Sequence, residues 1–297
     1  GNVWRIDMPG SSPSDSSEPW TVFKLASLAG ASNATDYRFF SEPSIVRTFI
    51  TETIEAEHTD ADGVKTTIVR TQEKPYDAVL LGSGDRSNPL GVDTDDRFFM
   101  IKDLLIRTQS LKSSDLPDGV KTISTTDLHD YTKDPFGDFS LPYSAQEKSD
   151  LEDLQIAVSL KYGWFLDFTQ SGEKSSSSAI VINGIAYFTS FTPPSLDPNV
   201  VTCELPNGQG WLYAVDLALG TKVYNWHSEN SDNREDRIAL ISEEFLGSPT
   251  LIVLPDDDGD SNTVDDVVGN LIVGRKIINV GFQLRTLRTN LYITEEY

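Results

Sequence analysis

Short alternating runs of apolar and polar residues follow one another along the chain, and polar turns separate them. The runs are rich in β-branched and aromatic residues, and Gly, Asn, Asp, Pro and Ser bound them, as is typical of β-strands. The pattern predicts an all-β fold with strands at Val3–Met8, Thr21–Leu25, Thr66–Arg70, Ala78–Gly82, Phe98–Lys102, Trp164–Phe168, Ala179–Ile182, Ile185–Ser190, Leu212–Leu217, Leu251–Leu254, Leu271–Arg275 and Tyr292–Thr294.

One stretch departs from this alternation. In Ser144–Ser159 the apolar residues have the mixed spacing of a helix, with Leu151 and Leu154 followed by Ile156 and Val158. We therefore predict one helix there and a shorter helical turn at Thr126–Tyr131.

A five-residue pattern occurs three times: an aromatic residue, any residue, an aliphatic residue, Asp and an apolar residue. The copies are Trp4–Met8, Trp164–Phe168 and Tyr213–Leu217, and a turn with Gly and Lys follows two of them, at Ser171–Lys174 and Leu219–Lys222. A strand that ends in Asp before a Gly turn indicates a β-hairpin in which the Asp accepts backbone N–H groups.

Repeated antiparallel units of about 40–50 residues favour a β-propeller over a sandwich. We interpret residues 1–297 as part of one propeller domain, an incomplete ring with long inserted loops, in which Trp4, Trp164 and Tyr213 occupy equivalent places. Blade-like units lie near 1–50, 76–106, 160–194, 208–245 and 247–295, and insertions lie at 51–71 and 108–145.

The charge excludes several classes of partner. Lys and Arg number 24 and Asp and Glu 46, which gives a net charge of −22, so nucleic acid and anionic membranes would be repelled. Cys203 is the single cysteine, which leaves no disulfide framework or thiolate metal cluster. The apolar runs are too short for a membrane span, and the start at Gly1 suggests a piece of a longer polypeptide or a processed one.

Two resemblances give these patterns a family. The segment Tyr213–Trp226 (YAVDLALGTKVYNW) resembles the repeat signature of quinoprotein-like propellers, in which a Trp packs between blades. A longer series resembles the C-terminal propeller of the PilY/PilC family of type IV pilus biogenesis and tip-adhesin proteins. Its segments are Gly1–Pro9, Arg38–Arg47, Tyr76–Asp103, Asn183–Pro194 and Gly208–Gly220, in this order.

The resemblance implies a non-enzymatic module at the bacterial cell surface or pilus tip. Its partners would be minor pilins, pilus tip proteins, or a host-cell or abiotic surface, and calcium would regulate it. The family's calcium loop precedes the segment that begins here at Gly1, so that site does not fall on these residues. Two alternatives stay open: a quinoprotein-like enzyme, whose adjacent cysteine pair this sequence lacks, and an outer-membrane scaffold protein.

A second candidate calcium site lies within the chain. Asp256, Asp258, Asp260 and Asn262 alternate in an acidic segment, which is the spacing of oxygen ligands that wrap a calcium ion. The match to an EF-hand loop is imperfect, because Ser261 stands where Gly is required and Val267 where a Glu is required. The other interpretation is a solvated acidic hairpin tip between Leu251–Leu254 and Val267–Val273.

Other polar residues are interpreted as structural. We expect Gly82 and Gly84 to bring the chain close to itself, with Asp85 and Arg86 engaged by backbone groups or by each other. Ser83 lacks the frame of a nucleophile elbow. Asp93, Asp95 and Asp96 suggest a solvated loop, and His58, His129 and His227 lack a second ligand at metal spacing.

Overall fold

The computed structural model describes residues 1–59, 65–112, 116–117, 119–132, 135–136, 144–175, 177–194, 208–224, 238–242, 245–255 and 267–284. Its strands are β1 (Asn2–Asp7), β2 (Thr21–Ser27), β3 (Ser44–Thr59), β4 (Lys65–Gly82), β5 (Arg97–Asp103), β6 (Ile123–Ser124), β7 (His129–Asp130), β8 (Gly163–Asp167), β9 (Lys174–Ser175), β10 (Ile180–Ile182), β11 (Ile185–Thr192), β12 (Gln209–Asp216), β13 (Ile238–Ser242), β14 (Thr250–Pro255), β15 (Val267–Val273) and β16 (Lys276–Leu284). One helix, α1 (Ala145–Ser159), and two 3₁₀ turns, Asn33–Thr35 and Thr125–Asp127, complete the described elements. The fold is mostly β, as the alternation predicts.

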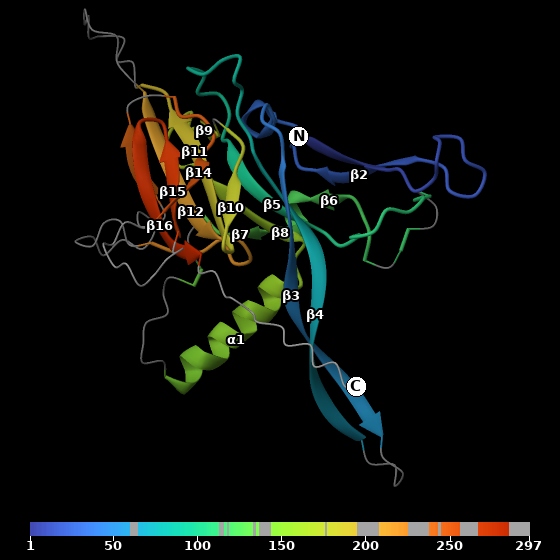
Figure 1. Ribbon diagram of the computed structural model, residues 1–297. Helices are drawn as coiled ribbons and strands as arrows, with labels where there is room; N and C mark the ends of the chain where they lie inside the picture. Colours follow the sequence, from blue (N-terminus) through green and yellow to red (C-terminus); the bar gives the residue numbers. More distant parts are fainter. Residues whose placement is uncertain are drawn as a thin grey trace, which may run out of the picture.

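The described strands form four sheets (Figure 1). Their strand orders are β1-β2-β6, β3-β4-β5-β8-β7, β10-β11-β12-β13 with β9 beside β11, and β14-β15-β16. The pairs β2–β6 and β7–β8 are parallel, and the other described pairs are antiparallel.

Neighbouring sheets share buried cores in chain order. Alternate residues of β5 point to opposite faces, so Phe98 stacks on Phe188 of β11 at 3.6 Å between ring centroids, while Phe99 packs in the cluster with Phe23 of β2. A third core joins β12 to β15 and includes Leu212 and Leu271. Each sheet therefore packs against the next one along the chain.

The predicted helix is confirmed as α1. Ser144 caps it by accepting from the Glu147 amide at 3.2 Å, and the Glu147 carboxylate accepts in return from the Ser144 amide at 2.7 Å. Val158 and Leu154 pack on the core that contains Trp164. The shorter predicted turn exists only as the 3₁₀ turn Thr125–Asp127, because the chain then extends into β7.

Two predicted boundaries need correction. The insertion predicted at 51–71 continues the β3–β4 hairpin, whose pairing runs without a break from Ser44↔Leu80 to Thr59↔Lys65. The strand predicted at Leu271–Arg275 ends at Val273, because Gly274 has a φ of +58° and turns the chain into β16. The strand predicted at Tyr292–Thr294 lies outside the described residues.

The threefold pattern places its Asp residues as predicted, at the last position of β1, β8 and β12. Of these three residues, only Asp216 directly precedes a tight hairpin turn. Its carboxylate accepts from the backbone amides of Ala218 and Leu219, at 2.9 and 2.7 Å. The hairpin prediction is wrong at Asp167, because the next strand, β9, pairs with β11 instead of β8. The aromatic positions also differ: Trp164 and Tyr213 are buried, whereas Trp4 is 56% exposed.

Candidate functional site

The loop that joins β4 to β5, residues 83–96, is the centre of the site. It begins where β4 passes β9 so closely that a Cβ on Gly82 would lie 2.1 Å from the Ser175 hydroxyl oxygen. A Cβ on Gly84 would lie 2.7 Å from the Lys174 Cβ. The predicted close approach at these two glycines is confirmed, and the neighbouring segment is β9.

Asp85 organises the start of the loop. Its carboxylate accepts from the Ser87 amide at 2.9 Å and from the Arg38 guanidinium at 2.7 Å. The Ser87 hydroxyl and amide, with the Arg38 charge, lower the pKa of Asp85. The predicted engagement of Asp85 by the backbone is therefore confirmed. Arg86 differs from the prediction, since its guanidinium lies 5.7 Å from the centroid of the Phe245 ring.

The buried side chain of Lys174 holds the middle of the loop, residues 88–91. It is 2% exposed, and its Nζ donates to the carbonyl oxygens of Asn88 at 3.2 Å, Pro89 at 3.1 Å and Gly91 at 2.7 Å. Burial lowers the pKa of Lys174, while the carboxylates of Asp96, Asp85 and Asp93 raise it. One buried ammonium thus satisfies three carbonyls of a loop that has no regular secondary structure.

The end of the loop is held by a buried carboxylate. Asp96 is 2% exposed and accepts from the Ser83 hydroxyl at 2.7 Å and from the Thr94 hydroxyl at 2.8 Å. Burial raises the pKa of Asp96. The interpretation of a solvated loop is wrong for Asp96, while Asp93 and Asp95 are exposed. Ser83 is fully buried and accepts from the Arg97 amide at 2.8 Å, in line with its structural interpretation.

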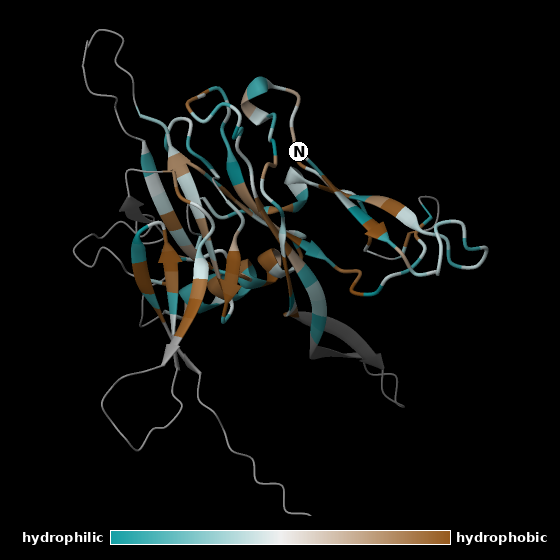
Figure 2. Ribbon diagram, turned by 45° about the horizontal axis from the view of Figure 1, so that its top comes forward, coloured by the Kyte–Doolittle hydropathy of each residue, from teal (hydrophilic) through white to brown (hydrophobic). Residues whose placement is uncertain are grey.

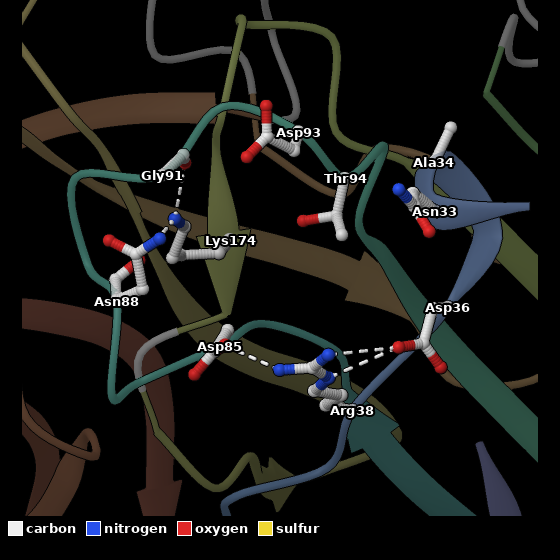
Figure 3. A pocket seen from close by; sticks show the side chains of 10 residues that line it. All are labelled: Asn33, Ala34, Asp36, Arg38, Asp85, Asn88, Gly91, Asp93, Thr94 and Lys174. Carbon is white, nitrogen blue, oxygen red and sulfur yellow. Dashed lines mark hydrogen bonds and ion pairs between the residues drawn. The ribbon is translucent and has the colours of Figure 1, made fainter.

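This loop forms one wall of a polar cavity of about 580 Å³ (Figure 3). The opposite wall is the segment 33–38, which the Arg38 guanidinium joins to the loop by bonding both Asp36 and Asp85. The lining residues are mostly polar or charged: Asn33, Ala34, Asp36, Arg38, Asp85, Asn88, Gly91, Asp93, Thr94 and Lys174. Three of them are carboxylates, two are primary amides and two are cations, and the Arg38 guanidinium bonds two of the carboxylates, Asp36 and Asp85.

A second, more open groove of about 570 Å³ contains Arg86 from the same loop. Phe40 and Phe245 are partly exposed there, and four serines add hydroxyl groups. The lining is Phe40, Ser41, Glu42, Arg86, Ser177, Ser178, Phe245, Gly247 and Ser248. A single braced loop therefore contributes to two neighbouring depressions of different chemistry.

The predicted calcium ligands cannot be placed in this site. Asp256, Asp258, Asp260 and Asn262 lie outside the described residues, although the strands that flank them are confirmed as the antiparallel pair β14–β15. Within the described part of the chain, no group of three or more His, Cys, Asp or Glu side chains is placed to hold a metal ion. No described helix is long and apolar enough to cross a membrane.

His129, the histidine whose side chain the structure describes, does not line either depression. His129 lies in β7 with its ring centroid 4.7 Å from that of Tyr131, and burial lowers the pKa of His129. The side chain of His58 and the whole of His227 lie outside the described residues. Sequence reasoning missed Lys174, whose only signal was its place in the Gly–Lys turn of the second repeat.

Comparison of the chain with protein-family models, with curated proteins and with solved structures gives no match.

Proposed function

We propose that this chain is a non-enzymatic recognition module of the PilY/PilC type, acting in type IV pilus biogenesis or at the pilus tip. The observation that carries the proposal is the braced 83–96 loop, which Lys174 and Arg38 hold between two cavities. A loop that is ordered before binding loses little conformational entropy when a partner docks.

We propose that the four sheets are consecutive blades of a β-propeller. Each sheet shares a core with the next along the chain, which supports this architecture. The proposal requires neighbouring sheets to be related by similar rotations about one axis. A stack without a common axis would contradict it.

The chemistry of the polar cavity favours a partner that is basic or rich in hydrogen-bond donors. Asp36 and Asp85 in its lining are bonded to Arg38, whereas Asp93 is exposed, and the whole chain carries a net charge of −22. Complementary charge would speed encounter and favour such partners over acidic ones. Minor pilins, pilus tip proteins and host-cell or abiotic surfaces are the partners that we propose, with calcium binding at Asp256–Asn262 as the regulator.

The test is genetic. A strain without the gene should lose surface pili or adhesion, and the wild-type gene should restore both. Asp93→Lys reverses the charge of an exposed cavity residue and should restore pili or adhesion less well. Asp153→Lys makes the same change on the exposed surface of α1 and is the matched control. Normal pili and adhesion in the deletion strain would contradict the proposed function.

A further inference from the structure

The second groove, of about 570 Å³, lies where four segments of the chain meet. They are residues 40–42 before β3, Arg86 of the 83–96 loop, residues 177–178 between β9 and β10, and residues 245–248 between β13 and β14. Hydrophobic segments run along the strands in Figure 2, whereas connecting segments with mostly polar residues line the groove. Its volume falls within the range of about 300–1,000 Å³ that is usual for small-molecule sites.

Hydrogen bonds around a buried threonine hold these segments together. The Thr189 hydroxyl of β11 shares a hydrogen bond of 2.6 Å with the Ser177 hydroxyl and donates to the Gly247 carbonyl oxygen at 3.3 Å. The Ser44 hydroxyl, at the start of β3, donates to the Ala179 carbonyl oxygen. Because these contacts form without a ligand, ordering the walls of the groove costs little conformational entropy on binding.

One aromatic ring in the groove has a free face. Phe40 is 50% exposed, and no other aromatic ring of the described residues packs on it. Phe245 instead packs on Phe191, with 5.3 Å between ring centroids, and has the Arg86 guanidinium 5.7 Å from its own centroid. An exposed ring within a depression is a platform for the C–H groups of a ligand. Phe40 therefore offers one apolar contact among polar groups.

The polar side chains of the groove are not used by the protein itself. Among the described residues, Glu42 and Arg86 form no ion pair, either with each other or with another residue. The hydroxyls of Ser41, Ser178 and Ser248 make no hydrogen bond to the part of the chain that is described. A carboxylate accepts hydrogen bonds, a guanidinium donates them and a hydroxyl does both. The groove therefore offers donors and acceptors together.

We propose that this groove binds a neutral saccharide, with one sugar ring packed on Phe40. A sugar ring has C–H groups on its faces and hydroxyls around its rim, and each hydroxyl both donates and accepts. The Glu42 carboxylate would accept from these hydroxyls, and the Arg86 guanidinium would donate to them. A charged ligand fits less well, because Glu42 would repel an anion and Arg86 would repel a cation.

Glycan binding by the whole chain tests the site. The probes are immobilised neutral oligosaccharides of glucose, galactose, mannose and N-acetylglucosamine, with sialylated and sulfated oligosaccharides beside them. At least one neutral oligosaccharide should bind. Its dissociation constant should change by less than about twofold between about 0.05 M and about 0.5 M sodium chloride, because salt screens interactions between charges. Binding of the acidic oligosaccharides alone, or of none, would overturn the proposal.

Two pairs of variants locate the binding. Phe40→Ala removes the platform and should raise the dissociation constant at least about tenfold. Phe49→Ala removes a phenylalanine of similar exposure, 59%, from β3 outside the groove and should leave it unchanged. Glu42→Ala should weaken binding, whereas Glu152→Ala on the exposed surface of α1 should not. All four side chains are exposed, so the variants should fold. Equal dissociation constants within either pair would overturn the proposal.

A peptide is the alternative ligand, and periodate separates the two. Mild periodate cleaves the vicinal diols of sugar rings and leaves the polypeptide backbone intact. A glycoprotein with neutral glycans should therefore lose its binding to the chain after this treatment, and undiminished binding would overturn the proposal. The saccharide site does not depend on the proposed role in pilus biogenesis: a chain that binds saccharides but is dispensable for pili and adhesion would contradict that role alone.

Discussion

The indole Nε1 of Trp164 donates a buried hydrogen bond of 2.9 Å to the carbonyl oxygen of Leu217. The Trp164 side chain lies in the core shared by two sheets. Leu217 is the first residue after β12, in the neighbouring sheet. The turn is tight against this ring, since a Cβ on Gly220 would lie 3.2 Å from the Trp164 Cδ2. The aromatic residue of one repeat thus fixes the turn of the next.

Trp164→Phe should lower the free energy of unfolding. The smaller phenyl ring leaves part of the buried indole volume empty, and the Leu217 carbonyl loses its buried donor, which alone typically costs about 1–3 kcal/mol. Urea unfolding followed by fluorescence measures the change. Trp20→Phe is the control, because its bond to the Gly10 carbonyl is exposed and should cost less than about 0.5 kcal/mol. Equal losses in the two variants would contradict the structural role of the Trp164 bond.

Gly82→Ala should also destabilise the fold. The new methyl group would overlap the Ser175 side chain, and relieving such overlap typically costs about 1–3 kcal/mol. Because Ser175 adjoins Lys174, the 83–96 loop should lose protection from hydrogen exchange as well. Gly247→Ala is the matched control, since no atom lies within 4 Å of its added Cβ. A Gly82→Ala protein as stable as the control would show that β4 and β9 are not in close contact.

Asp96→Asn should change how stability depends on pH. Burial raises the pKa of Asp96 above its ordinary value of 3.8, so the folded state holds the proton more tightly than the unfolded state. The stability from this group is complete below about pH 4 and is lost as pH rises through the folded pKa. The free energy of unfolding of Asp96→Asn, relative to wild type, should therefore rise between about pH 4 and pH 7. Urea unfolding across this range measures it, and a constant difference would contradict the prediction.

Calcium should bind at the segment between β14 and β15. This segment has three carboxylates within five residues, those of Asp256, Asp258 and Asp260. Their negative charges repel one another, and a bound calcium ion would relieve that repulsion. The missing Glu at the last EF-hand position predicts weak binding, with a dissociation constant of about 10⁻⁴–10⁻³ M. Calorimetric titration should give heat with wild type and much less with Asp258→Ala. Equal heats, or none in either protein, would leave this segment a solvated acidic tip.

Local patterns predicted α1 and many of the strands, but they missed β3, β13 and β16 and the two-residue strands β6, β7 and β9. The strands β5, β11 and β12 were predicted because short runs rich in β-branched and aromatic residues lie between polar turns. The helical spacing of Ser144–Ser159 predicted α1, and the Ser144–Glu147 capping box accounts for its start. The paired glycines Gly82 and Gly84 indicated a close approach, although they could not indicate β9 as the neighbour.

The partners of these elements were decided only by the tertiary structure. The same aromatic position is buried at Trp164, which packs in a core shared with the neighbouring sheet, and exposed at Trp4. Likewise Lys174 binds the carbonyls of residues more than eighty positions earlier in the chain, and Asp96 is buried while Asp93 is exposed. A strand's periodicity specifies which residues share a face, whereas burial and charge partners depend on which distant strand covers that face.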